Sequence, residues 1–189
     1  LIKDGPTEEV IPHYQNITFK KNETDFKNKL KAAEGKVKVE QNMLVEISNV
    51  SLSGKDLVSK EEFAIGEDFE VKVDYNVKQK IDDPIVIIDI IRSDGVLCCS
   101  LNSREAGINF GTLFGKNSLK LSFNNLNLAP GIYLTKISFW EKEMIHPYIV
   151  YSKNVMRVST KQGNLLTTAV FLPKVVWNQN TNIISNKEI

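Results

Sequence analysis

The sequence predicts an all-β protein, an antiparallel sandwich of immunoglobulin-like or jelly-roll type behind a short helical and linker segment. After about Val37, apolar and polar residues alternate with the period of two that strands show. Turn signals recur at short intervals, at Asp83-Pro84, Asp94-Gly95 and Pro130-Gly131, and we expect Pro130 to pre-set its turn and Gly131 to relieve the steric strain. No long amphipathic helix interrupts the strand patterns, which favours a sandwich.

The composition argues against a function in nucleic-acid binding. The chain has 189 residues, of which 42% are hydrophobic and 25% charged, as in ordinary globular domains. Its 24 Lys and Arg residues against 23 Asp and Glu leave a formal charge of +1. Such a balance provides no field that would attract nucleic acid, so we expect no nucleic-acid partner.

The first 36 residues differ from the rest. Pro6–Ile11 has the pattern of a short capped helix, with proline in the first turn and acidic residues at the positive end. Gln15–Lys38 is rich in Lys, Asn and Glu, which predicts a solvated linker with one weak helix around Asp25–Ala33. Because the chain begins at Leu1 and not at Met, we expect it to be part of a longer protein.

Eight segments carry strand patterns. Phe69–Val77 alternates without a break, which is typical of a half-buried strand. Ile85–Ile91 is apolar on both faces apart from Asp89, so it should be a central strand. The eight are Leu44–Val50, Phe69–Val77, Ile85–Ile91, Val96–Asn102, Leu119–Phe123, Ile132–Glu141, Tyr148–Ser159 and Leu165–Trp177. We therefore place the sandwich at residues 37–162 and a C-terminal strand with its tail at 163–189.

Motifs for catalysis or metal binding fail on inspection. Gly111–Asn117 resembles a P-loop, but it is one residue short, and Asn117 stands where a Ser or Thr would hold magnesium. Cys98 and Cys99 are neighbours, so in a strand they point to opposite faces and are poorly placed to form a disulfide or share a metal. No nucleophile has an evident base. We therefore expect no catalytic residue, no metal and no cofactor in this chain.

An ordered set of short motifs resembles a known family. Phe63–Tyr75 reads F-x-x-G-E-x-F-x-V-x-V-x-Y, and Ile81–Pro84, Asp94-Gly95, Leu101–Ser103 and Leu126–Tyr133 follow at suitable spacing. Together they resemble the carboxy-terminal domain of Wzt-type proteins, the ATP-binding subunits of bacterial ABC transporters that export O-antigen and related polysaccharides. Gly5–Tyr14 is similar to the segment where the ATPase domain of that family ends.

The resemblance implies a function and several partners. The sandwich would bind the capped non-reducing end of the O-antigen glycan, while ATP and Mg²⁺ would bind only the ATPase domain, which this chain lacks. That domain would contact the membrane subunit, placing the protein in the cytoplasm, peripheral to the bacterial inner membrane. The family also implies a homodimer, in some members with exchange of the last strand. Leu165–Trp177, after the hinge at Gln162–Asn164, suits exchange and in-place pairing equally well.

Candidate ligand-binding residues lie on strands and at their ends. Lys136, Ser138 and Trp140 alternate with more apolar residues, so they should share an open face of their strand. Asp89, on its apolar strand, needs a partner, which could be Arg92, Lys136 or a ligand hydroxyl. Asn102 and Arg104 follow the next strand and could reach the same face. The full set is Asp89, Arg92, Asn102, Arg104, Lys136, Ser138 and Trp140.

Each candidate also has a structural interpretation. Trp140 could cover an edge of the sandwich or lie in a dimer contact, Asp89 could form a buried ion pair, and Asn102 to Arg104 could be a polar turn. If the glycan cap is anionic, Arg92, Arg104 and Lys136 would be its counter-charges. Two other functions remain open: a structural dimerisation domain without a ligand site, and an interaction module outside any transporter.

Overall fold

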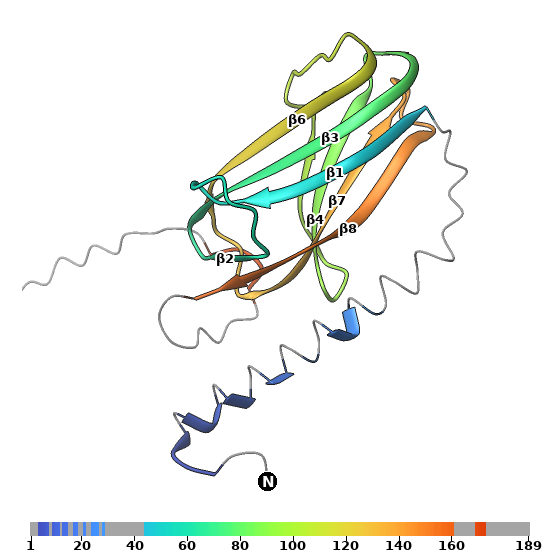
Figure 1. Cartoon of the computed structure of the whole chain (residues 1–189). Helices are drawn as coiled ribbons and strands as arrows, with labels where there is room; N and C mark the ends of the chain where they lie inside the picture. Colours follow the sequence, from blue (N-terminus) through green and yellow to red (C-terminus); the bar gives the residue numbers. More distant parts are fainter. Residues whose placement is uncertain are drawn as a thin grey trace, which may run out of the picture.

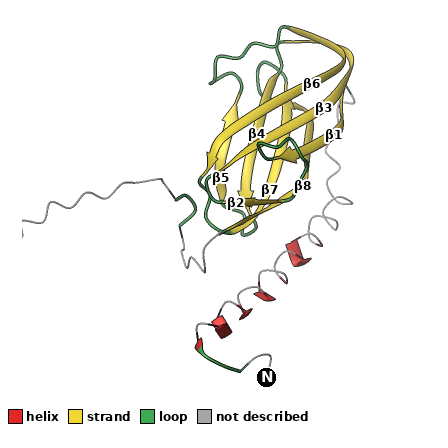
Figure 2. Cartoon of the chain, turned by 60° about the vertical axis from the view of Figure 1, so that its left-hand side comes forward, coloured by secondary structure: helices red, strands yellow, loops and turns green. Residues whose placement is uncertain are grey.

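The computed structural model describes residues 4–7, 9–11, 13–14, 17–18, 21, 24–26, 28, 44–160 and 169–172. Two sheets face each other as the layers of a β-sandwich (Figures 1 and 2). The smaller sheet has three antiparallel strands in the order β1-β3-β6. These strands are β1 (Val45–Ser53), β3 (Glu67–Asp82) and β6 (Thr112–Leu126). The predicted fold class is confirmed.

The larger sheet has five strands in the order β2-β8-β7-β4-β5. Its strands are β2 (Glu62–Ala64), β4 (Ile85–Arg92), β5 (Leu97–Asn102), β7 (Gly131–Trp140) and β8 (Pro147–Ser159). β2 runs parallel to β8, and every other neighbouring pair is antiparallel. β4 lies between β5 and β7, so the prediction of an interior strand for this apolar run is confirmed.

The core fills the space between the sheets. On β3 the alternating set from Phe69 to Val77 is buried, and the polar residues between them are half-buried or exposed. On β4 the inward residues are Val86, Ile88 and Ile90, all part of the same cluster. Burying one such side chain contributes about 1.5–3 kcal/mol relative to leaving it in water. The alternation read from the sequence therefore sets the face that each strand presents.

The two long sides of the sandwich differ. On one side the sheets are linked by Asn154 of β8, whose Nδ2 donates a hydrogen bond to the Val50 carbonyl of β1 at 3.0 Å. On the other side, β5 and β6 are the end strands of their sheets. Several of their inward side chains stay half-buried, as at Leu101, Leu121 and Phe123. The sandwich is closed along β1 and β8 and less covered along β5 and β6.

The helical segment at the start reaches further than the sequence indicated. The described residues between Thr7 and Asn28 are helical, including Ile17, Thr18 and Lys21, where we expected a solvated linker. Lys and Glu are favourable helix formers, so a charged stretch alone does not exclude a helix. None of the helices described here has the length and apolar character needed to cross a bilayer.

Phe26 from this segment packs on the larger sheet. It contacts a second apolar cluster, separate from the main core, that contains Ile132, Leu134 and Val155, and Ile91 packs beside it. These residues belong to β7, β8 and β4. The helical segment therefore covers part of the face of this sheet that points away from the other sheet.

Two further expectations concern the chain around Pro130. Gly131 is not among the residues with positive φ, so the prediction that it relieves turn strain is wrong. The predicted strand Leu165–Trp177 lies mostly outside the described residues. Two of its described residues, Val170 and Leu172, form backbone hydrogen bonds with the chain before β7. The Val170 carbonyl accepts one from the Ala129 N–H at 2.9 Å, and the Leu172 N–H donates one to the Asn127 carbonyl at 2.7 Å. This short antiparallel pairing joins the chain after β8 to the segment between β6 and β7.

Candidate functional site

The candidate residues lie mainly on one surface, the face of the five-stranded sheet that points away from the core, called here the outer face. Register places Ser100 of β5, Asp89 of β4 and Lys136 of β7 in one row across three strands. Asp89 Oδ1 accepts a hydrogen bond from Ser100 Oγ at 2.7 Å, and Oδ2 accepts one from Lys136 Nζ at 3.1 Å. Asp89 is 8% exposed, so this ion pair satisfies a nearly buried carboxylate. Of the partners left open by the sequence, the structure selects Lys136.

A second row lies closer to the end of the sheet. Asn102, Ile87 and Ser138 are opposite one another, and Trp140 follows next to Ile85. Ser138 is buried, and its Oγ accepts a hydrogen bond from Trp140 Nε1 at 2.8 Å. The indole is half-buried. Since residues two apart in a strand share a face, this bond ties the ring back along its own strand and restricts its orientation.

Asn102 and Arg104 lie where the loops meet. The Asn102 Oδ1 accepts a hydrogen bond from the Arg104 backbone N–H at 2.9 Å, which closes the turn after β5. The Arg104 guanidinium donates to the Lys142 carbonyl. Arg104 thereby joins the β5–β6 connection to the β7–β8 connection. Both residues form the polar turn that was one interpretation of this stretch, at the rim of the outer face.

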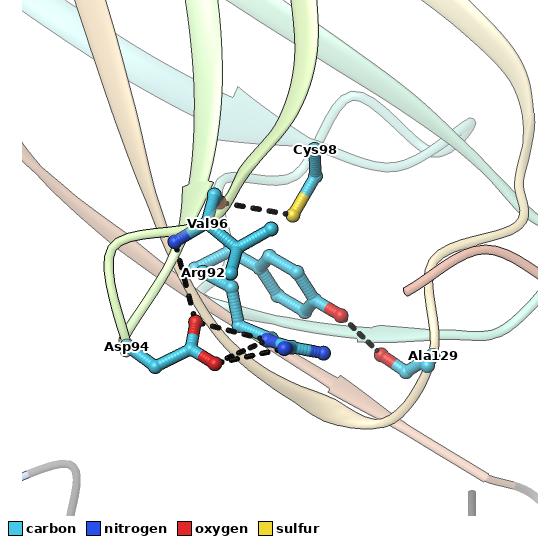
Figure 3. A network of polar contacts seen from close by, with 6 residues as sticks. Arg92, Asp94, Val96, Cys98 and Ala129 are labelled. Atoms are coloured by element: carbon cyan, nitrogen blue, oxygen red, sulfur yellow. Dashed lines mark hydrogen bonds and ion pairs between the residues drawn. The ribbon is translucent and has the colours of Figure 1, made fainter. Parts of the chain in front are cut away.

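Arg92 lies in a different polar network, which includes Asp94 (Figure 3). Its Nε and Nη2 donate to the Asp94 carboxylate at 2.8–3.1 Å, and the hydrogen bonds raise the pKa of Arg92 and lower that of Asp94. Arg92 is paired with Tyr133, whose side chain belongs to the core, not to the outer face. Because Arg92 follows Asp89 by an odd number of residues, strand alternation already points the two side chains to opposite faces. The structure therefore does not bring Arg92 together with the other candidate residues.

Ser100 is a site residue that the sequence reading missed. Its hydroxyl is the second hydrogen-bond donor to Asp89. A signal existed: counting outward from the Asp94-Gly95 turn as a two-residue hairpin places Ser100 opposite Asp89, as the structure has it. Serines are common in strands of this length, so composition alone did not single it out.

The chemistry of the outer face suits the binding of a polar ligand. It combines one aromatic ring, a carboxylate–ammonium pair and two hydroxyl groups. Within residues 44–160 and the other described positions, no three His, Cys, Asp or Glu side chains are grouped as metal ligands. The arrangement offers hydrogen-bond partners beside a partly exposed ring, the combination by which proteins orient polar ligands.

The two sheets define the class, a β-sandwich domain. Residues 38–171 match the model of the Wzt C-terminal domain family, and the chain belongs to that family. This domain is a non-catalytic C-terminal part of ABC transporter ATPases, and the family places the chain in an O-antigen ABC transporter. The resemblance inferred from the motifs is thereby confirmed.

One solved structure supports the same fold. A crystal structure of the C-terminal domain of wzt matches with a TM-score of 0.64 and 14% identity, covering 72% of this chain and 84% of that one. A Niemann-Pick type C2 protein from Japanese carpenter ant reaches a TM-score of 0.46 at 9% identity, over 61% of this chain and 93% of that one. No curated sequence relative matches the chain.

Proposed function

We propose that this domain recognises the capped non-reducing end of an O-antigen glycan before export, and that the outer face is its binding surface. The observation that carries the proposal is the row of Ser100, Asp89 and Lys136, together with the anchored Trp140 four residues further along β7 on the same sheet face of a domain from this family. Asn102 and Arg104 would border the ligand from the rim.

The side chains match what a sugar offers. A pyranose presents hydroxyl groups in fixed directions around its ring and one or more apolar C–H faces. The Asp89–Lys136 pair holds a carboxylate and an ammonium in place, and the ammonium keeps N–H groups for a further acceptor. Trp140 is oriented by Ser138, which reduces the rotamer entropy that the ring would lose on stacking against a sugar.

The proposal extends to the setting in which the domain acts. The domain would act in the cytoplasm at the inner membrane, attached to an ATPase domain that binds ATP and Mg²⁺ and contacts the membrane subunit. The sandwich itself would hold no cofactor. Binding of a finished glycan would select chains that are ready for export, while hydrolysis would take place in the ATPase domain.

A homodimer is part of the proposal. The β6 strand ends its sheet, and the pairing of residues 170–172 with residues 127–129 shows that chain after β8 can add to the segment following β6. The donor of such a strand would be either the same chain or a second copy. These features also favour a second candidate function, a dimerisation domain that positions two ATPases and binds no glycan.

Binding measurements with Trp140→Ala test the proposal. By calorimetry, the wild type should bind the cognate capped oligosaccharide saturably and the uncapped one at least tenfold more weakly, and Trp140→Ala should lose most of the affinity. Stacking of a nucleic-acid base on an aromatic side chain contributes about 1–3 kcal/mol of binding free energy, and we expect a loss on a comparable scale here. The matched control is Phe114→Ala, an exposed aromatic on the other sheet at 62% exposure, which should bind like the wild type.

Two results would reject the glycan site. One is equal binding of capped and uncapped glycan, since it removes selection of finished chains. The other is unchanged binding by Trp140→Ala, since it moves any site away from the outer face. Absence of all glycan binding, with an intact dimer in light scattering, would favour the dimerisation domain instead.

A further inference from the structure

We propose that the glycan end accepted by the outer face is uncharged, and that termini bearing phosphate or carboxylate are excluded. This inference rests on the proposed function and assigns the chemical class of its ligand. An anionic cap would need a free counter-charge, and the sequence offered Arg92, Arg104 and Lys136 for that role. In the structure each of these three cations is already engaged.

Lys136 forms an ion pair with Asp89, and breaking this pair would cost considerable free energy. Its ammonium lies 3.1 Å from Asp89 Oδ2, and the Asp89 side chain is 11% exposed while that of Lys136 is 34% exposed. A phosphate that drew Lys136 away would leave a nearly buried carboxylate with only the Ser100 hydroxyl as a partner. Uncompensated charge in such a place is strongly unfavourable. The row across β5, β4 and β7 therefore presents a pair of zero net charge.

Arg92 is removed from the outer face by strand alternation and by its partner. Its guanidinium makes three contacts with the Asp94 carboxylate, the fork geometry that binds carboxylates most strongly. A phosphate group on the outer face could not reach it without breaking that pairing. Arg92 thus contributes a neutralised charge on the opposite side of the sheet.

Arg104 lies at the rim, but its surroundings are acidic. Three connections meet at the end of the sandwich next to Trp140: β3–β4, β5–β6 and β7–β8. The Asp83 N–H donates a hydrogen bond to the Gly111 carbonyl, and the Arg104 guanidinium donates one to the Lys142 carbonyl. These connections carry four carboxylates and two cations, and Asp82 at the end of β3 adds a fifth carboxylate. The carboxylates are Asp82, Asp83, Glu105, Glu141 and Glu143, and the cations are Arg104 and Lys142.

The acidic potential reaches the strand beside Trp140. Burial raises the pKa of Tyr148, at the start of β8, and the charges of Glu141, Glu143 and Asp82 raise it further. Register places Trp140 opposite Pro147, the neighbour of Tyr148. A phosphate or uronate bound against Trp140 would therefore approach like charge from this end of the sheet.

A neutral sugar meets none of these penalties. The Lys136 ammonium has three N–H groups, so it can donate to a sugar hydroxyl while keeping its bond to Asp89. The exposed Ser100 has oxygen lone pairs left after its bond to Asp89. Hydroxyl groups therefore bind without dismantling the ion pair, and an anion does not.

The test uses an array of oligosaccharides with identical backbones and either a neutral, a phosphorylated or a uronate terminus. The neutral probe should bind with an affinity that changes less than twofold between low and physiological salt, and the charged probes should bind at least tenfold more weakly. Inorganic phosphate should not compete. Tighter, salt-sensitive binding of a charged probe would overturn the inference, and binding of no probe would reject the proposed function along with it.

Two variants test whether the discrimination against charged probes depends on the Asp89–Lys136 ion pair or on the net charge of the domain. Asp89→Asn frees the Lys136 ammonium, so the discrimination against the phosphorylated probe should fall at least threefold. Asp94→Asn frees Arg92 on the other face and should leave the discrimination as in the wild type. Circular dichroism checks that both variants fold, and an equal response of the two would contradict the assignment. If Asp89→Asn does not fold, the salt dependence of probe binding by the wild type still tests the inference.

Discussion

Tyr133 explains why the turn before β7 has the sequence Ala-Pro-Gly-Ile-Tyr. The ring is fully buried, and its hydroxyl donates a hydrogen bond to the Ala129 carbonyl at 2.7 Å (Figure 3). A Cβ on Gly131 would lie 3.2 Å from Tyr133 Cε2, closer than such contacts normally are. Glycine therefore suits residue 131 because the ring lies against its backbone, and not because the turn requires a left-handed residue.

The buried phenol makes stability sensitive to alkali. Burial raises the pKa of Tyr133 to about 12, against about 10 in an unfolded chain. A raised pKa in the folded state means that the contribution of Tyr133 is fully present below about pH 10 and is lost as pH rises towards 12. Tyr133→Phe should lose about 1 kcal/mol at pH 8, where the hydrogen bond is intact. Its free energy of unfolding should then fall less steeply above pH 10.

Urea denaturation at pH 8 and at pH 11 measures both effects. An exposed tyrosine does not carry this pH dependence, so a parallel decline in wild type and Tyr133→Phe would show that other groups cause the alkaline loss.

At the scale of single residues, alternation along one strand was the reliable signal. It placed Lys136, Ser138 and Trp140 on one face, as found. What alternation cannot give is the residue opposite in the neighbouring strand, so the partner of Asp89 stayed open among three choices. Arg92 lies an odd number of residues from Asp89, so strand alternation alone separates the two side chains. Register, which depends on contacts between distant segments, decides such pairs.

At the scale of elements, β8 has a second role beyond pairing with β7. Asn154 faces inward, opposite Thr135, and its side-chain amide reaches the Val50 carbonyl in the other sheet. A hydrogen bond between sheets fixes how the layers are positioned along the closed side.

Asn154→Ala should destabilise the fold by about 1–2 kcal/mol, because the Val50 carbonyl loses its partner from β8. Amide hydrogen exchange should increase along β1, since that strand loses its link to the larger sheet. Asn76→Ala, on the half-buried outward side of β3, is a suitable control and should change stability by no more than about 0.5 kcal/mol. Unchanged exchange in β1 would show that Asn154 does not hold the sheets together.

Strands with long apolar alternation were found from the sequence, and irregular or short ones were not. β4 matched the expectation to within one residue, and β3 contains the expected Phe69–Val77 but extends from Glu67 to Asp82. β6 was expected only at Leu119–Phe123, although it begins at Thr112, because Gly115, Lys116 and Asn117 interrupt the hydrophobic pattern. β2 has three residues and pairs in parallel with β8, so it owes its conformation to a distant strand. Local sequence carries little information about such an element.

At the scale of the whole molecule, the helical segment at the start and the sandwich share a surface. Phe26 covers the apolar cluster of Ile132, Leu134 and Val155 on the outer face. Leu134 is two residues from Lys136, so the covered cluster and the proposed binding surface are neighbours on the same sheet. Without a cover, three apolar side chains in contact would be open to water, a patch that favours association between copies.

Phe26→Ser should therefore increase binding of an apolar dye and lower the concentration at which the protein begins to self-associate. The melting temperature should fall by a few degrees at most, because the main core is untouched. Ile17→Ser, a helical residue at 37% exposure that is not part of this contact, is the matched control. Equal dye binding by the two variants would show that Phe26 does not protect the sheet.

The bond between Trp140 and Ser138 has a practical consequence for spectroscopy. The chain has two tryptophans, Trp140 and Trp177. Replacing Trp177 with Phe leaves one indole, whose N–H is tied to a buried hydroxyl and whose ring is half-open to solvent. Its emission wavelength would respond to anything that lies against that ring or displaces the hydroxyl. The domain thus contains its own optical probe at the place where a ligand is expected, and no label has to be attached.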